Sequence, residues 1–119
     1  MSIFTIILAS IVAIELLFII YLETFAPHSN STSRVFNMAK DELQRKSMTT
    51  LFKNQGIYNG LLAVFLLYGI FTGNLEVTTI FVLFVIGAAG YGAATSSPKI
   101  LLTQGGPAIL TLISILLFN

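Results

Sequence analysis

Four long apolar stretches alternate with shorter polar segments along the chain. They cover about residues 3–25, 51–72, 77–95 and 100–118. Each has roughly the 20 residues that an α-helix needs to cross the hydrocarbon core of a bilayer. The pattern therefore predicts four membrane-spanning helices.

The second and third connections, residues 73–76 and 96–99, are only a few residues long. Short connections make neighbouring helices antiparallel. The predicted fold is therefore all-α: a polytopic membrane protein with an antiparallel four-transmembrane-helix bundle, forming a single domain over residues 1–119.

The first connection, residues 26–50, is the only long polar segment. After a stretch rich in helix breakers, Val35, Phe36, Ala39 and Leu43 recur at helical spacing between basic side chains. This spacing predicts a short amphipathic helix lying at the membrane interface. A solvated helical linker explains the same pattern equally well.

Basic residues cluster on one side of the predicted bundle. Those in or beside the first connection are Arg34, Lys40, Arg45, Lys46 and Lys53, and the remaining one, Lys99, lies in the third connection. The positive-inside rule places connections 26–50 and 96–99 in the cytoplasm. Both termini are then predicted to lie outside the cytoplasm, in a multi-pass protein of a bacterial cell membrane.

Composition supports lipid as the solvent for much of this chain. Hydrophobic residues make up 55% and charged residues 9%, with a mean hydropathy of +0.90, whereas soluble domains carry about a quarter charged residues. The chain has no Cys and one His, so neither a metal nor a cofactor is expected. A net charge of +1 gives no nucleic-acid-binding surface.

Glu15 is the most informative single residue, because it interrupts the first apolar stretch near its middle. A carboxylate at that depth costs about 2.5–3.5 kcal/mol on insertion scales, so it is seldom kept without a partner or a role. Glu15 also argues against a cleaved signal peptide, as do the missing basic n-region and the length of the run. We expect a retained helix in which Asn59, Gln104 or a tyrosine hydroxyl bonds Glu15.

Most other polar side chains of the spans fall in the predicted cytoplasmic half. A one-sided layer predicts a polar pocket reached from the cytoplasm, whereas polar groups that only join helices would be expected at both ends. The predicted pocket residues are Glu15, Glu23, Asn54, Gln55, Tyr58, Asn59, Tyr91, Thr95, Gln104, Gly105, Gly106 and Pro107.

Three of these residues, Glu23, Asn54 and Pro107, also have a purely structural interpretation. Glu23 is expected at the interface, paired with Lys99 or Lys53, and Asn54 is a candidate cap of the second helix. Pro107 after two glycines predicts a kinked or opened fourth helix, which lines binding sites in some membrane proteins and is only a packing feature in others.

Small residues in the third stretch recur at spacings of three and four. They are Gly87, Gly90, Ala93 and Ala94. This pattern favours close helix packing over chemistry.

Several strings of the chain resemble the domain of unknown function 1304 family of small integral membrane proteins. The most specific are Asn54-Gln55-Gly56-Ile57-Tyr58-Asn59-Gly60 and Gln104-Gly105-Gly106-Pro107-Ala108, supported by the segments 13–25 and 91–95 in the same order. The resemblance implies a four-span bacterial membrane protein and supplies no biochemical function. The family often has His after the first-span Glu, whereas Leu16 follows Glu15 here, which argues against a mechanism that needs a Glu–His pair.

Three functions fit these observations. The first is a non-catalytic membrane or envelope-support protein that binds a ligand, membrane lipids, a second copy or another membrane protein. The second is a small proton- or cation-coupled transporter or permeation unit that uses Glu15. The third is an intramembrane lipid-modifying enzyme, which ranks last because the chain has no nucleophile–His pair and no phosphate-binding loop. Size favours the first function, and the one-sided polar layer favours the second.

Overall fold

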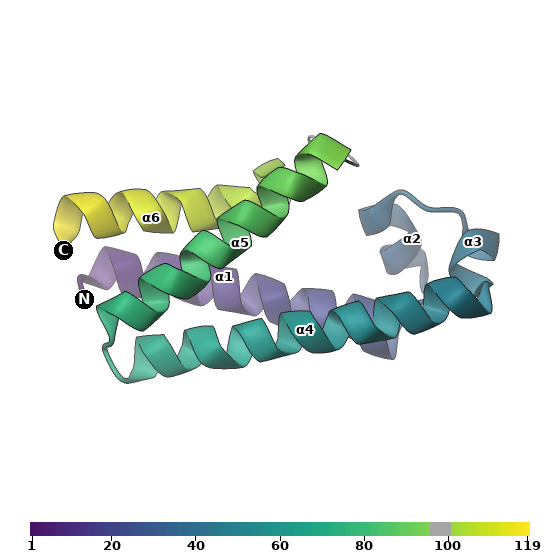
Figure 1. Cartoon of the computed structure of the whole chain (residues 1–119), viewed down its shortest axis with the longest axis horizontal. Coiled ribbons are helices and arrows are strands. Elements are labelled where there is room, and N and C mark those ends of the chain that lie inside the picture. Colours follow the sequence, from purple (N-terminus) through teal and green to yellow (C-terminus); the bar gives the residue numbers. More distant parts are fainter. Residues whose placement is uncertain (96–100) are drawn as a thin grey trace. The chain divides into compact units, whose positions relative to one another are not determined.

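The computed structural model describes residues 1–95 and 101–119, and the regular structure in these residues is entirely helical (Figure 1). The all-helical prediction is therefore confirmed. The elements are α1 (Ile3–Ile20), η1 (Tyr21–Phe25), α2 (Asn30–Phe36), α3 (Lys40–Gln44), α4 (Lys46–Phe71), α5 (Leu75–Thr95), η2 (Leu101–Gly105) and α6 (Gly106–Phe118). The labels η1 and η2 denote π-helical turns.

Two helices of the described chain are long and apolar enough to cross a membrane. They are Ile3–Phe25, which joins α1 to η1, and α5, Leu75–Thr95. Thr103–Phe118 is a shorter apolar helix. Helix α4 has 26 residues, but Lys46, Lys53 and Asn54 make its first half polar.

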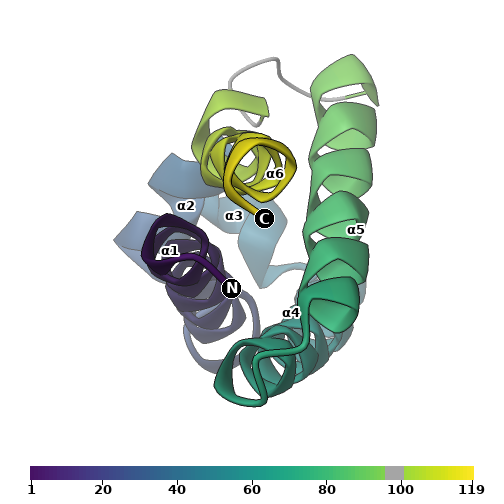
Figure 2. The same cartoon turned by 90° about the vertical axis from the view of Figure 1, so that its left-hand side faces the viewer.

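The chain divides into two compact units. One comprises residues 1–15 and 62–119, and the other comprises residues 16–61. In the first unit, α6 runs antiparallel to the first part of α1, and Figure 2 shows the two chain ends beside each other. Phe4 packs on Phe118 at a ring-centroid distance of 5.4 Å, which joins these two helices near the N- and C-termini of the chain.

The turn between α4 and α5 is tight, and its residues explain why. Gly73 has a positive φ of 64°, a conformation that glycine adopts at little cost. The side chain of Asn74 then accepts a hydrogen bond from the Val77 amide and caps α5. The two helices stay close, because a Cβ at Gly69 would lie 3.0 Å from the Thr78 backbone nitrogen.

The second unit contains the polar connection, folded as two short helices. This corrects the prediction of one amphipathic helix. Asn37 adopts a left-handed conformation, with φ 53° and ψ 50°, and ends α2, so Ala39 precedes α3 as its N-cap. Leu43 is buried, whereas Val35 is 48% exposed. The apolar residues at helical spacing therefore do not share a single helix face.

The Gly-Gly-Pro step takes the form of a change of helix type. The π-helical turn η2 ends at Gly105, and Pro107 is the second residue of α6. Proline is well tolerated there because a first-turn N–H has no partner within the helix.

Two of the four small residues of α5, Gly87 and Gly90, make no close helix contact within the described residues. A Cβ at Gly87 or Gly90 would meet nothing within 4 Å in the described structure. Close helix contact occurs instead at glycines of α4.

Candidate functional site

A buried carboxylate meets a side-chain amide in the unit formed by residues 16–61. The Nδ2 atom of Asn59, on α4, donates a 2.6 Å hydrogen bond to Oε1 of Glu23, on η1. Glu23 is 4% exposed. Residues 36 positions apart thus form a polar contact between η1 and α4.

Glycine spacing on α4 allows this contact. A side chain at Gly56 would collide with the Thr24 hydroxyl and approach Glu23 Cβ to 3.1 Å, and one at Gly60 would collide with Ile20. Two glycines four residues apart lie on one helix face and let a second helix approach closely. The Glu23–Asn59 bond therefore forms within a close helix crossing.

A second hydrogen bond supports the same crossing. The Thr24 hydroxyl donates to the backbone carbonyl of Lys53 at 3.0 Å. Glu23 and Thr24 both belong to the π-helical turn η1, whose wider winding changes the direction of its side chains relative to a continuous α-helix. A carboxyl held in this way can fix the register of two helices, and it can also exchange a proton or bind a cation.

The partners of the acidic side chains differ from those predicted. Asn59 bonds Glu23 and not Glu15, and Glu23 is buried, whereas its place at the membrane interface stays a prediction. Lys53 contributes its backbone carbonyl, bonded by Thr24, whereas Lys99 lies outside the described residues. Glu15 is partly buried on α1.

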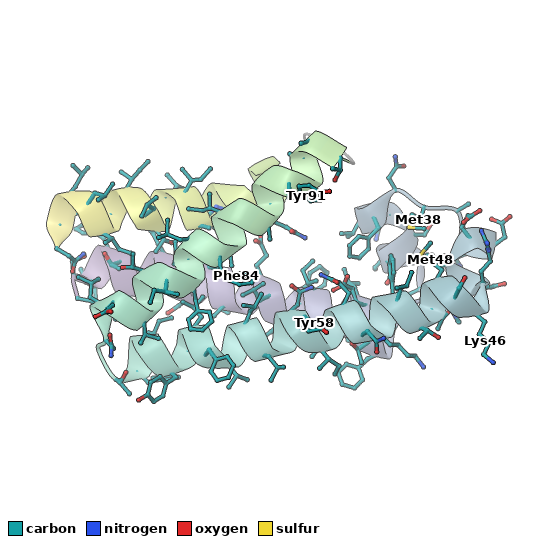
Figure 3. All side chains as sticks on the ribbon, in the orientation of Figure 1. Met38, Lys46, Met48, Tyr58, Phe84 and Tyr91 are labelled. Atoms are coloured by element: carbon teal, nitrogen blue, oxygen red, sulfur yellow. The ribbon has the colours of Figure 1, made fainter. Side chains whose placement is uncertain are left out.

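The other predicted residues of α4 lie on its surface. Helix α4 begins at Lys46, so Asn54 lies inside the helix and does not cap it, which corrects that prediction. Asn54, Ile57 and Tyr58 line an open depression of about 360 Å³. Figure 3 shows Tyr58 on α4, and its side chain is 65% exposed.

The remaining predicted residues belong to the unit of residues 1–15 and 62–119. Tyr91 is 74% exposed near the end of α5 (Figure 3), and the Thr95 hydroxyl donates to the Tyr91 carbonyl at 2.8 Å. Gln104 and Gly105 lie in η2, and Gly106 and Pro107 begin α6. One pocket joining all twelve residues stays a prediction.

Comparison with known proteins places the chain in a family. The model of the family described as "Protein of unknown function (DUF1304)" matches residues 10–116. The chain belongs to the DUF1304 family. The resemblance seen in the sequence is thereby confirmed.

A relative of this DUF1304 chain is the "Uncharacterized protein YpaA" of Lactococcus lactis subsp. lactis strain IL1403. The two are 57% identical over 116 residues, covering 96% of this chain and 98% of the relative. No solved structure matches. The family match includes Glu23, Asn59 and both glycines of the crossing.

Gly56 and Gly60 were not predicted from the sequence as packing residues of this DUF1304 chain. Their signal was the spacing Gly-x-x-x-Gly, which is typical of closely packed membrane helices. The two glycines lie inside the string Asn54–Gly60, where the amides and the tyrosine draw attention to chemistry.

A second polar cluster, at the opposite end of α1, was also missed. The Thr5 hydroxyl lies 2.7 Å from that of Ser114, and the Asn119 side-chain amide donates to Thr5 Oγ1 at 2.7 Å. The backbone N–H of Ser2 donates to Asn119 Oδ1 at 2.9 Å. Polar contacts between helices therefore occur at both ends of α1, which favours a joining role for such contacts in the DUF1304 chain.

Proposed function

We propose that this DUF1304 protein is a non-catalytic protein of the cell membrane, with a membrane-support or ligand-binding role. The observation that carries the proposal is the buried Glu23–Asn59 hydrogen bond within the glycine crossing. Such a pair joins two helices in lipid, where polar side chains gain by bonding each other.

The proposed arrangement has four spans. Ile3–Phe25 and α5 have the required length and apolarity. Helix α4 is long enough, and η2 with α6 extends over residues 101–118, which corresponds to about 27 Å at 1.5 Å per residue. The basic connection 26–50 would lie in the cytoplasm and the termini outside.

Tight packing around Glu23 supports a non-catalytic role. The carboxyl is almost inaccessible, and neighbouring Gly56 leaves no room for an added side chain. A catalytic acid or base must reach a substrate atom directly or through one water. A lipid-modifying enzyme is therefore the least favoured function.

A proton- or cation-coupled transporter is the second candidate. A carboxyl inside an apolar spanning helix is a usual component of proton pathways, and η1 places Glu23 in a π-helical turn of the kind found at functional sites. Glu15, on the same helix, would be a second ionisable position on such a pathway.

Cysteine accessibility tests the membrane arrangement. The chain has no Cys, so single cysteines at Ser31, Asn74 and Ser2 can be labelled one at a time with an impermeant maleimide. We expect labelling of Ser31→Cys only from the cytoplasmic side and of the other two only from outside. Labelling of Ser31→Cys and Asn74→Cys from the same side would overturn the four-span arrangement.

Proteoliposomes separate support from transport. Proton and monovalent-cation fluxes would be compared for the wild type, Glu23→Gln and Glu15→Gln, with exposed Glu76→Gln as the matched control. The proposal expects fluxes equal to those of protein-free vesicles in every case. A wild-type flux that either Glu23→Gln or Glu15→Gln removes, and that Glu76→Gln keeps, would establish the transporter instead.

A further inference from the structure

Positive charge is concentrated in the second unit. Between residues 26 and 53 there are five basic and two acidic side chains, for a net charge of +3, whereas the whole chain carries +1. The acidic residues Asp41 and Glu42 both lie in the first turn of α3. This segment therefore presents an excess of cations.

The part of this segment before α4, residues 26–45, packs on the first turns of α4. His28 Nε2 lies 2.8 Å from the Thr49 hydroxyl, which donates to the Leu43 carbonyl at 2.8 Å. Phe36 packs edge to face on Phe52, with 5.0 Å between ring centroids. The basic side chains of α2 and α3 therefore extend from a folded surface, which lowers the entropy lost on binding.

The cations differ in how far they are already paired. Arg45 forms an ion pair with Glu42 at 3.4 Å. In the described residues, Lys46 and Lys53 form no ion pair. They are exposed and seven residues apart, so they share a face of α4. Figure 3 shows the Lys46 side chain extending away from the helix.

The length of α4 places these lysines near a membrane surface. Its 26 residues correspond to about 39 Å, which exceeds the roughly 30 Å hydrocarbon core by about six residues. If the opposite end, at Phe71, marks one boundary of the core, Lys46 lies beyond the other. Lys53 lies just inside it, where its long side chain can extend to the headgroups.

We propose that Lys46 and Lys53, together with Arg34 of α2 and Lys40 of α3, bind the headgroups of anionic phospholipids in the cytoplasmic leaflet. The inference rests on the membrane placement given under Proposed function. Charge complementarity supports it, since each basic side chain near an anionic surface favours binding about fivefold.

Tryptophan quenching tests this inference in vesicles. The chain has no Trp, so Ile57→Trp places one reporter on the face of Lys46 and Lys53, and Phe71→Trp places a matched reporter fourteen residues along the same helix. Vesicles of mixed phosphatidylglycerol and phosphatidylcholine would carry bromine on the acyl chain of one lipid at a time. We expect phosphatidylglycerol to be enriched about threefold or more at Ile57→Trp and not at Phe71→Trp.

Charge variants and salt decide the cause of any enrichment. Replacing Lys46 and Lys53 by Gln should remove it at Ile57→Trp, and replacing both by Arg should keep it. Raising the salt concentration from about 0.05 to 0.5 M should also reduce it, because exposed charges are screened. The salt measurement uses only the Ile57→Trp reporter variant, so it tests the inference even if the Gln variant does not fold.

The possible outcomes test lipid binding separately from the membrane placement on which it rests. Equal quenching by both brominated lipids at the two reporters, or enrichment unchanged by salt, would overturn lipid binding and leave the membrane placement intact. No quenching by either lipid would overturn the membrane placement itself, and the headgroup site with it.

Discussion

Gly56 of α4 and Thr24 of η1 are in direct contact, so that a methyl group on Gly56 would overlap the Thr24 hydroxyl and lie 3.0 Å from Thr24 Cβ. The same hydroxyl donates to the Lys53 carbonyl at 3.0 Å. A side chain at Gly56 would therefore break this bond and separate the two helices next to Glu23 and Asn59.

Replacement of Gly56 by Ala should lower the free energy of unfolding by about 1–3 kcal/mol, the usual cost of overpacking. Gly60→Ala should cost less, because it meets the terminal methyl of Ile20, which can rotate away. Gly87→Ala is the control, since nothing lies within 4 Å of its added Cβ, and it should be neutral or stabilising. Unfolding of the three variants by SDS in mixed micelles would rank them.

A Gly56→Ala variant as stable as Gly87→Ala would contradict the close crossing. The Glu23–Asn59 contact would then lack the helix approach that brings its two side chains together.

The Glu23–Asn59 bond should appear as a coupling energy in a double-mutant cycle. Glu23→Leu and Asn59→Leu are each expected to be destabilising, and their effects should couple by about 0.6–1.7 kcal/mol, from the average to the largest coupling measured for hydrogen bonds between membrane helices. Glu23→Gln keeps an acceptor oxygen for the Asn59 amide and should retain most of the stability.

The matched cycle pairs Glu23→Leu with Tyr58→Leu. Tyr58 neighbours Asn59 in sequence but is 65% exposed, so its coupling with Glu23 should be near zero. Equal coupling in both cycles would show that the first cycle reports a general change in α4 and not the bond.

The hydroxyl of Thr5 should contribute more to stability than an equally buried hydroxyl that bonds only within its own helix. Thr5 contacts Ser114 and Asn119, whereas the Thr111 hydroxyl donates to the Pro107 carbonyl four residues back. Thr5→Val should cost about 1–2 kcal/mol, because it leaves the polar partners of Thr5 without their bonds. Thr111→Val, with the same change of shape, should cost clearly less in the same unfolding measurement.

Asn37 should tolerate Gly but not a β-branched residue. Its φ of 53° lies in the left-handed region, which Gly adopts freely and other residues adopt at a cost of about 1–2 kcal/mol. Thermal unfolding should show Asn37→Gly near the wild type and Asn37→Val destabilised. Gln44→Val, at the exposed end of α3, controls for the side-chain change.

Helical character and the main helix ends follow from the apolar stretches. The first and third predicted stretches, 3–25 and 77–95, differ from the observed helices by at most two residues. Helix α4 begins at Lys46, five residues before the predicted stretch, because an apolar run marks only the apolar part of a helix and the helix can continue into polar residues. The apolar pattern alone also did not reveal the break at Asn37, because this residue lies in the polar connection between two apolar stretches.

The sequence by itself also determined which polar groups the apolar stretches contain, since Glu15, Glu23 and Asn59 each stand out in apolar surroundings. Only the tertiary structure decided that Asn59 meets Glu23. Glu15 and Glu23 are eight residues apart in the sequence, so the partner of Asn59 depends on how far one helix is displaced along the other. Contacts of Gly56 and Gly60 with Thr24 and Ile20 fix that displacement, and steric fit between two helices is a property that neither sequence segment carries alone.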